Sequence, residues 1–156
     1  MAVTTKPYKT WTPTSKDRGE DTPSLTPQLL GFDTTQRPLS DAIRDGFPYG
    51  VFQRLHEHLN VPQSVLADHL GISLSTLHRR KSEGSFKPIE SDRLWRYLNL
   101  YSKAVDVLES EAAARHWLTT SKLALGGGIP LAAARTEIGA KEVENLLIRI
   151  EHGVFG

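Results

Sequence analysis

The 156-residue chain contains no cysteine, which excludes a disulfide scaffold, a thiolate metal site and a cysteine nucleophile. It also lacks any apolar run near the roughly 18 residues that a transmembrane helix needs. The first ten residues, MAVTTKPYKT, lack the apolar region of a secretory signal. The formal net charge is only +1, so nucleic-acid binding would have to depend on local charge. We therefore expect a soluble, cytoplasmic protein of one or two small domains.

The first 37 residues differ in composition from the rest of the chain. They contain nine threonines and four prolines and show no helical or strand period. Such a segment buries too little apolar surface to offset its chain entropy, which favours a flexible leader. The alternative is that Trp11, Leu29, Leu30 and Phe32 fix the leader against the rest of the protein. The sequence leaves both possibilities open.

From Pro38 onward, apolar residues recur with the period of an amphipathic helix, between glycine, proline and asparagine boundaries. No segment shows the sustained alternation of a strand, so we predict an all-α fold without internal repeats. Within it we expect Val65, Leu66 and Leu70 to be buried on one helix, and Leu74 and Leu77 on the next. The predicted helices cover residues 39–46, 51–60, 62–70, 73–84, 88–108, 111–119, 130–136 and 143–150.

Residues 63–84 have the pattern of a helix-turn-helix. Ala67 is small where two helices would cross, and Gly71 allows the short turn between them. Ile72 and Leu77 would fill the space between the helices, and Ser73 is a suitable N-cap for the second one. The segment resembles the Xre-type helix-turn-helix of phage-like repressors. The resemblance implies a lambda-repressor-like helical bundle that binds DNA.

On the second helix, Ser75, His78, Arg79 and Ser82 share a face without apolar residues. In the repressor geometry this face would enter the major groove, where Arg79 could bind guanine O6 and N7. The plainer alternative is a solvated basic helix face. Further candidates for DNA contact, at phosphates or at the openings of the helices, are Gln63, Ser73, Arg80, Lys81 and Lys87.

The C-terminal stretch 123–156 has a different pattern. It consists of a glycine turn, a proline-started helix, a glycine break and an amphipathic helix, and its net charge from Thr136 onward is −2, from two basic and four acidic residues. The negative charge favours a partner other than DNA. The elements LGG-x-x-PL at 125–131, T-x-x-G at 136–139 and R-I-x-x-G at 149–153 resemble the toxin-binding domain of the Xre/MbcA/ParS antitoxin family.

This second resemblance implies an antitoxin. Family members of this architecture typically accompany a RES-domain toxin that is similar to ADP-ribosyltransferases and consumes NAD. The C-terminal domain would obstruct the toxin, and the helix-turn-helix would repress the shared operon, usually as a homodimer. By position, the toxin-binding residues would be Pro130, Leu131, Arg149, Gly153, Val154, Phe155 and Gly156.

Several alternatives accompany this hypothesis. The chain could be a stand-alone Xre-type repressor whose C-terminal domain only dimerises. For Val143, Leu146, Leu147 and Ile150 we favour core packing over toxin contact. The aromatic residues Trp95, Tyr97, Tyr101 and Trp117 suit a subunit interface and a protein core equally well. We divide the chain into a leader (1–37), a DNA-binding domain (38–108) and a toxin-binding domain (109–156).

Nothing in the sequence indicates an enzyme, a cofactor or a metal site. The Gly126–Gly128 run lacks the Lys-Ser/Thr of a phosphate loop, and His56 and His58, two residues apart, would point in different directions on a helix. No nucleophile motif organises the serines, histidines and aspartates. We expect the acidic residues Glu109, Glu111, Glu142 and Glu144 to lie on solvated helix faces.

Overall fold

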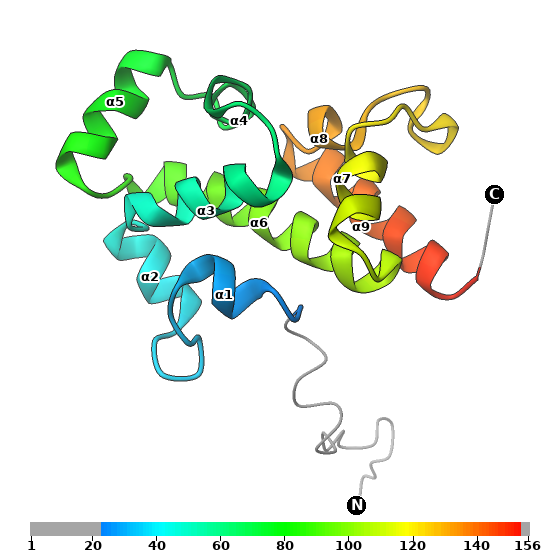
Figure 1. Ribbon diagram of the computed structural model, residues 1–156, viewed down its shortest axis with the longest axis horizontal. Coiled ribbons are helices and arrows are strands. Elements are labelled where there is room, and N and C mark those ends of the chain that lie inside the picture. Colours follow the sequence, from blue (N-terminus) through cyan, green and yellow to red (C-terminus); the bar gives the residue numbers. More distant parts are fainter. Residues whose placement is uncertain (1–22, 154–156) are drawn as a thin grey trace, which may run out of the picture.

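The structure, a computed structural model, describes residues 23–153. These residues form helices and no named strand; only two isolated bridges, Pro48 with Ser85 and Lys122 with Gly128, have β geometry. The all-α prediction is therefore confirmed. In chain order (Figure 1) the elements are α1 (Thr26–Leu30), α2 (Leu39–Asp45), α3 (Tyr49–Leu59), α4 (Gln63–His69), α5 (Leu74–Glu83), α6 (Pro88–Leu108), α7 (Glu111–Leu118), the 3₁₀ helix η2 (Leu123–Leu125), α8 (Pro130–Ala133) and α9 (Glu137–Glu151).

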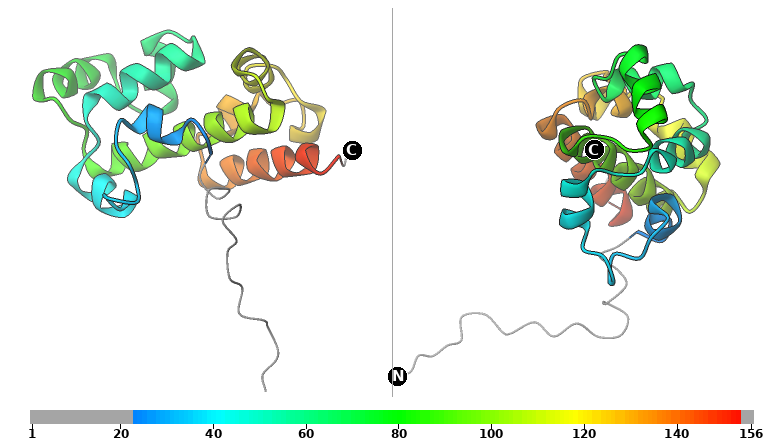
Figure 2. Two further views of the ribbon diagram at one scale, coloured as in Figure 1. Left: turned by 60° about the horizontal axis from the view of Figure 1, so that its bottom comes forward. Right: turned by 90° about the vertical axis from the view of Figure 1, so that its left-hand side faces the viewer.

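Helix α6 forms the central axis of the molecule. It begins with Pro88 at a first-turn position, where the missing N–H costs nothing. Its fully buried residues recur every three or four positions, as in Leu94, Tyr97, Leu98 and Tyr101. One group of helices, α2, α4 and α5, lies toward the start of α6, and a second group, α7 and the end of α9, lies toward its far end, with α1, α3 and α8 alongside its middle (Figures 1 and 2). Since both groups pack against one continuous helix, they form a single body.

The part of the leader that the structure describes packs against this body. Leu29 and Leu30 are buried, and the Arg54 guanidinium donates to both of their carbonyl oxygens at 2.9 Å. Phe32 contacts the ring of Phe47 edge-on. The structure thus packs residues of the predicted leader against the helical body, and the sequence showed no helical period there because α1 has only five residues. Trp11 lies outside the described residues.

Helices α4 and α5 form the predicted helix-turn-helix. Ala67, Ile72 and Leu77 are buried between the helices, and Gly71 takes a φ of +70° in the turn. The Arg93 guanidinium on α6 donates to the carbonyl oxygen of Leu70 at 3.2 Å. This contact holds the end of α4 against α6.

Hydrogen bonds hold the C-terminal region on α6 and on α4 of the helix-turn-helix. The Tyr97 hydroxyl donates to the Leu131 carbonyl oxygen at 3.0 Å, and Arg135 binds both the carboxylate and the carbonyl oxygen of Asp68 at 3.2 Å. No linker separates the regions predicted as two domains. Tyr97 and Tyr101 are buried in the core of the chain itself, which excludes them from a subunit interface; Trp95 and Trp117 are partly buried.

Among residues 23–153, none of the helices combines the length and the apolar character that crossing a membrane would require.

Candidate functional site

The exposed face of α5 is polar. Leu77 and Arg80 are the buried residues of this helix, and Ser75, His78, Arg79 and Ser82 are all exposed. The Ser73 hydroxyl accepts from the backbone N–H of Thr76 at 3.2 Å, which confirms the predicted N-cap. The helix therefore presents hydrogen-bonding side chains to solvent along its length.

Additional polar groups border this face. Lys81 is exposed on α5 itself, and Lys87 is exposed where α6 begins. Gln63, the first residue of α4, is exposed, and its side-chain amide lies 3.4 Å from Nε2 of His56. The structure thus leaves Gln63, Ser73, Lys81 and Lys87 accessible at the openings and edges of the two helices.

Arg80 differs from its neighbours. Its guanidinium donates to both carboxylate oxygens of Glu90, at 2.7 and 3.0 Å, and to Glu83 at 3.0 Å. Burial opposes ionisation of Glu90, but hydrogen bonds from Arg80 and from the Lys87 backbone lower the pKa of this carboxyl below its ordinary value. Arg80 was predicted to contact a phosphate; in the structure its side chain is instead buried and connects α5 to the start of α6.

Leu74 also departs from the prediction. It was expected to face inward with Leu77, but 61% of its surface is exposed. The rotation of α5 is fixed by Leu77 and Arg80, and at 100° per residue this places Leu74 at the border of the exposed face. Val65, predicted to be buried on α4, is exposed as well. Short helices bury a narrow stripe, and an apolar residue at its edge remains in solvent.

In the C-terminal region, Pro130 and Leu131 are buried. The Leu131 carbonyl oxygen accepts from Tyr97, and the proline opens the short helix α8. These two residues were predicted to face a partner; in the structure they are instead buried and support the local fold. Their occurrence in the LGG-x-x-PL motif at 125–131 is explained by this structural role.

The T-x-x-G element has a similar explanation. The Thr136 hydroxyl accepts from the backbone N–H of Gly139 at 3.0 Å and caps α9. A Cβ at Gly139 would overlap the carbonyl oxygen of Ala133 in α8. Only glycine therefore allows α8 to pass so closely over the start of α9.

The remaining predicted residues lie in and after α9. Val143 and Leu147 are buried and Leu146 and Ile150 are partly buried, in agreement with the favoured core packing. Arg149 and Gly153 are exposed at the end of the helix. Val154, Phe155 and Gly156 lie outside the described residues.

The loop between α7 and α8 was predicted only as a turn. It places Leu123 almost entirely in solvent, with 95% of its surface exposed. Gly126 and Gly127 adopt φ values of +66° and +86°, which a turn requires. An isolated exposed leucine leaves no periodic pattern, so the sequence offered no signal for it.

Two of the acidic residues expected on solvated faces connect helices instead. Glu111 accepts from the Tyr101 hydroxyl at 2.6 Å and lies 2.7 Å from Nδ1 of His58. These contacts, that with Tyr101 first, lower the pKa of the Glu111 carboxyl. Glu144 accepts from Lys103 at 2.7 Å. Both pairings join α6 to a neighbouring element, and in the part of the chain that is described no cluster of histidine and acidic residues could bind a metal ion.

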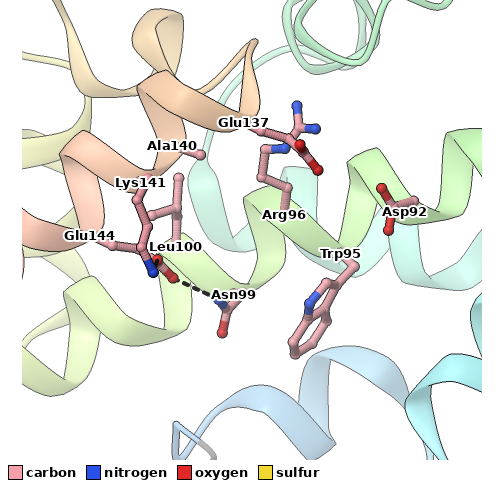
Figure 3. A pocket seen from close by; sticks show the side chains of 9 residues that line it. All are labelled: Asp92, Trp95, Arg96, Asn99, Leu100, Glu137, Ala140, Lys141 and Glu144. Carbon is pink, nitrogen blue, oxygen red and sulfur yellow. Dashed lines mark hydrogen bonds and ion pairs between the residues drawn. The ribbon is translucent and has the colours of Figure 1, made fainter.

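A shallow cavity of about 230 Å³ lies between α6 and the first turns of α9. Figure 3 shows that charged side chains of both helices border it, with Glu144 close to Asn99. No serine, threonine or histidine lines it, so it offers no hydroxyl nucleophile with a histidine base. The lining residues are Asp92, Trp95, Arg96, Asn99, Leu100, Glu137, Ala140, Lys141 and Glu144.

Comparison with known proteins shows which family these two regions resemble. The profile of an antitoxin Xre-like helix-turn-helix domain matches residues 38–99, and that of the antitoxin Xre/MbcA/ParS C-terminal toxin-binding domain matches residues 103–153. A protein of Yersinia enterocolitica named antitoxin Xre is 35% identical over 119 residues, which cover 75% of this chain and 80% of that protein.

The chain belongs to the Xre family of antitoxins. Two further proteins named antitoxin Xre are similar to it. One from Photorhabdus laumondii is 30% identical over 81% of this chain and 88% of its own length. Another, from Pseudomonas putida, is 31% identical over 71% of this chain and 69% of its own length.

In this Xre-family chain the two family segments meet inside α6, between residues 99 and 103. The boundary predicted at 108/109 lies at the end of α6. The helix-turn-helix segment (38–99) and the C-terminal family segment (103–153) thus share one helix, and α5 and the end of α9 lie at opposite ends of the molecule (Figures 1 and 2).

Proposed function

We propose that this antitoxin binds a RES-type toxin that consumes NAD and covers its active-site entrance so that NAD cannot enter. The observation that supports the proposal is the order of a helix-turn-helix and a toxin-binding domain along one chain. The chain itself would act by steric exclusion in the cytoplasm, without catalysis and without a cofactor.

The toxin would contact the end of the molecule opposite α5. Arg149 and Gly153 are exposed there, and Val154, Phe155 and Gly156 follow directly in sequence. An aromatic side chain such as that of Phe155 suits a pocket on a partner protein. The buried Pro130 and Leu131 would support this surface without contacting the toxin.

The second part of the proposal is that the chain represses its own operon as a homodimer. Helix α5 would enter the major groove with Ser75, His78 and Arg79 facing the bases, and Arg79 would bind guanine with two hydrogen bonds. Lys81, Lys87, Gln63 and Ser73 would contact phosphates. Two copies of α5 would bind half-sites about 34 Å apart, or a multiple of that distance.

The proposal is tested by expressing the tagged chain together with the protein of the adjacent open reading frame and measuring cellular NAD. We expect a stable complex and preserved NAD, with NAD depletion when this chain is absent. If the neighbouring protein forms no complex and NAD does not change, the proposed toxin is wrong.

The alternative is a repressor whose C-terminal domain only dimerises. Deletion of residues 149–156 separates the two functions, because a pure repressor should lose little beyond the stability of its dimer. We expect the deletion to abolish protection from the toxin and to leave operator binding nearly unchanged.

A further inference from the structure

Leu123 is the most exposed large apolar residue among those that the structure describes. It lies in η2, inside the toxin-binding segment 103–153, and none of the residues first predicted to face the toxin supplies an exposed apolar side chain within the described range. Single exposed apolar residues are common on protein surfaces. The loop that presents this one has two further features.

The first feature is that hydrogen bonds join the start of the loop, residues 121–122, to its end, residues 127–128. The Lys122 backbone N–H donates to the Gly128 carbonyl oxygen at 2.9 Å, and the Gly127 N–H donates to the Lys122 carbonyl oxygen at 2.9 Å. The Ser121 hydroxyl donates to the Gly127 carbonyl oxygen at 2.8 Å. Leu123 is thus presented by a backbone whose position is already set.

The loop is also anchored to the body beneath it. Leu125 packs partly buried against the core, and the Lys122 ammonium lies 5.2 Å from the centre of the Trp117 ring. Alternate side chains of η2 therefore have opposite roles, since Leu125 fixes the loop and Leu123 points away from it. A loop backbone that is held in place before binding loses little conformational entropy when a partner covers the side chain that it carries.

The second feature is the open surface beside Leu123. A Cβ at Gly126 or Gly127 would meet no atom within 4 Å, so the surface over these two glycines of the same loop is open. Ile129, which follows the glycines, has 41% of its surface exposed. A protein surface could therefore approach the loop backbone closely and enclose Leu123.

We propose that Leu123 is an apolar anchor through which this chain binds its toxin, inserting into an apolar pocket on the toxin surface. The inference rests on the proposed toxin binding and adds a contact residue outside the C-terminal tail. The loop lies at the end of the molecule that carries α7, α8 and α9, away from α5 (Figures 1 and 2). The toxin could thus occupy it while α5 contacts DNA.

The test is a Leu123→Ser variant of the full chain, titrated calorimetrically with the purified protein of the adjacent open reading frame. We expect the affinity to fall at least roughly tenfold, as for an interface anchor, and the melting temperature to stay the same because the side chain has almost no contacts to lose. Leu123→Met should restore most of the affinity. Ile89→Ser removes an apolar residue that is 66% exposed in the DNA-binding region and should leave toxin affinity unchanged.

Three results would overturn the inference. Equal toxin affinity for Leu123→Ser and the unaltered chain would exclude the anchor while leaving the proposed function intact. A matching fall in the melting temperature of Leu123→Ser would mean that the residue stabilises its own loop. A loss of self-association at unchanged toxin affinity would assign the loop to a second copy of this chain. Failure of the unaltered chain to bind would contradict the proposed function itself.

Discussion

The two ends of the molecule expose different kinds of side chains. Along α5 the exposed residues are mainly polar or charged, and Leu74 is the one large apolar residue that this helix leaves in solvent. On the α7–α8 loop the most exposed side chain is the apolar Leu123. Polar groups suit the edges of bases and phosphates, whereas an apolar anchor suits a pocket on a protein.

The ends are alike in one respect: most of their recognisable motif residues are buried. Ala67, Leu77 and Leu131 are buried, and Gly139 leaves room for a neighbouring backbone. The motifs therefore describe how each end is built. The side chains that would contact a partner are mostly those that the motifs leave unspecified.

Arg79 and Arg80 provide the sharpest test of this contrast, because they are adjacent in sequence but Arg79 is exposed and Arg80 is buried. Arg80→Ala would leave Glu90 buried without its partner, and we expect a loss of about 3 kcal/mol in the free energy of unfolding. Arg79→Ala should change this free energy by less than about 0.5 kcal/mol. Urea denaturation of both variants measures the difference.

The pH dependence of the same pair adds a second readout. The pKa of Glu90 is lowered in the folded protein, so its ion pair stabilises the fold above the ordinary carboxyl pKa of 4.5 and is lost as the pH falls through the lowered value. The stability difference between the unaltered chain and Arg80→Ala should therefore shrink in acid. A difference that does not change with pH would contradict the ion pair.

Alanine substitutions at Gly139 and at Gly84 compare how tightly the backbone is packed at the two ends of the molecule. Gly139→Ala forces a Cβ onto the Ala133 carbonyl oxygen, and we expect a destabilisation of about 2–3 kcal/mol. Gly84→Ala meets no atom within 4 Å and adds only the strain of a positive φ, about 1 kcal/mol. Equal melting temperatures for the two variants would show that α8 can move away from α9.

Arg79→Ala should weaken operator binding by roughly 1–3 kcal/mol and relax specificity at one base pair. Fluorescence anisotropy on operator duplexes, each with one base pair changed, measures both effects. The expectation fails if the variant loses the same affinity on every duplex, since this would assign Arg79 to the phosphates.

Leu74 gives the smallest expected effect. An exposed apolar side chain at the start of α5 can contact the C5-methyl group of thymine in the major groove. Replacing single operator thymines by deoxyuridine should weaken binding of the unaltered chain at one position by about 1 kcal/mol. Leu74→Ala should be insensitive to that replacement; if it remains sensitive, another residue contacts the methyl group.

Much of the helical fold could be predicted from the sequence. Glycine, proline and cap residues mark helix ends through local backbone chemistry, and the predicted cap at Ser73 and the turn at Gly71 are both confirmed. The prediction was weakest in short segments. Helix α1 has only five residues, and Leu29 and Leu30 are buried through contacts with a helix more than twenty residues away.

The candidate surfaces were less predictable, because a basic residue on a helix can contact solvent, DNA or a buried carboxylate. Arg80 was assigned to phosphates on charge and position, yet Glu90, ten residues further along, binds it. Glu111 was similarly assigned to solvent, although Tyr101 and His58 come to it from two other helices. Such pairings depend on how helices cross, which a local pattern does not specify.

The sequence by itself determined the all-α class, the helix-turn-helix and the family, since spacing, capping and motif order are local properties of the chain. Only the tertiary structure decided which side chains remain exposed. The rotation of α5 is set by Leu77 and by the Arg80–Glu90 pair, which places Leu74 in solvent. The braced loop that presents Leu123 likewise depends on hydrogen bonds that form when the two sides of the loop meet.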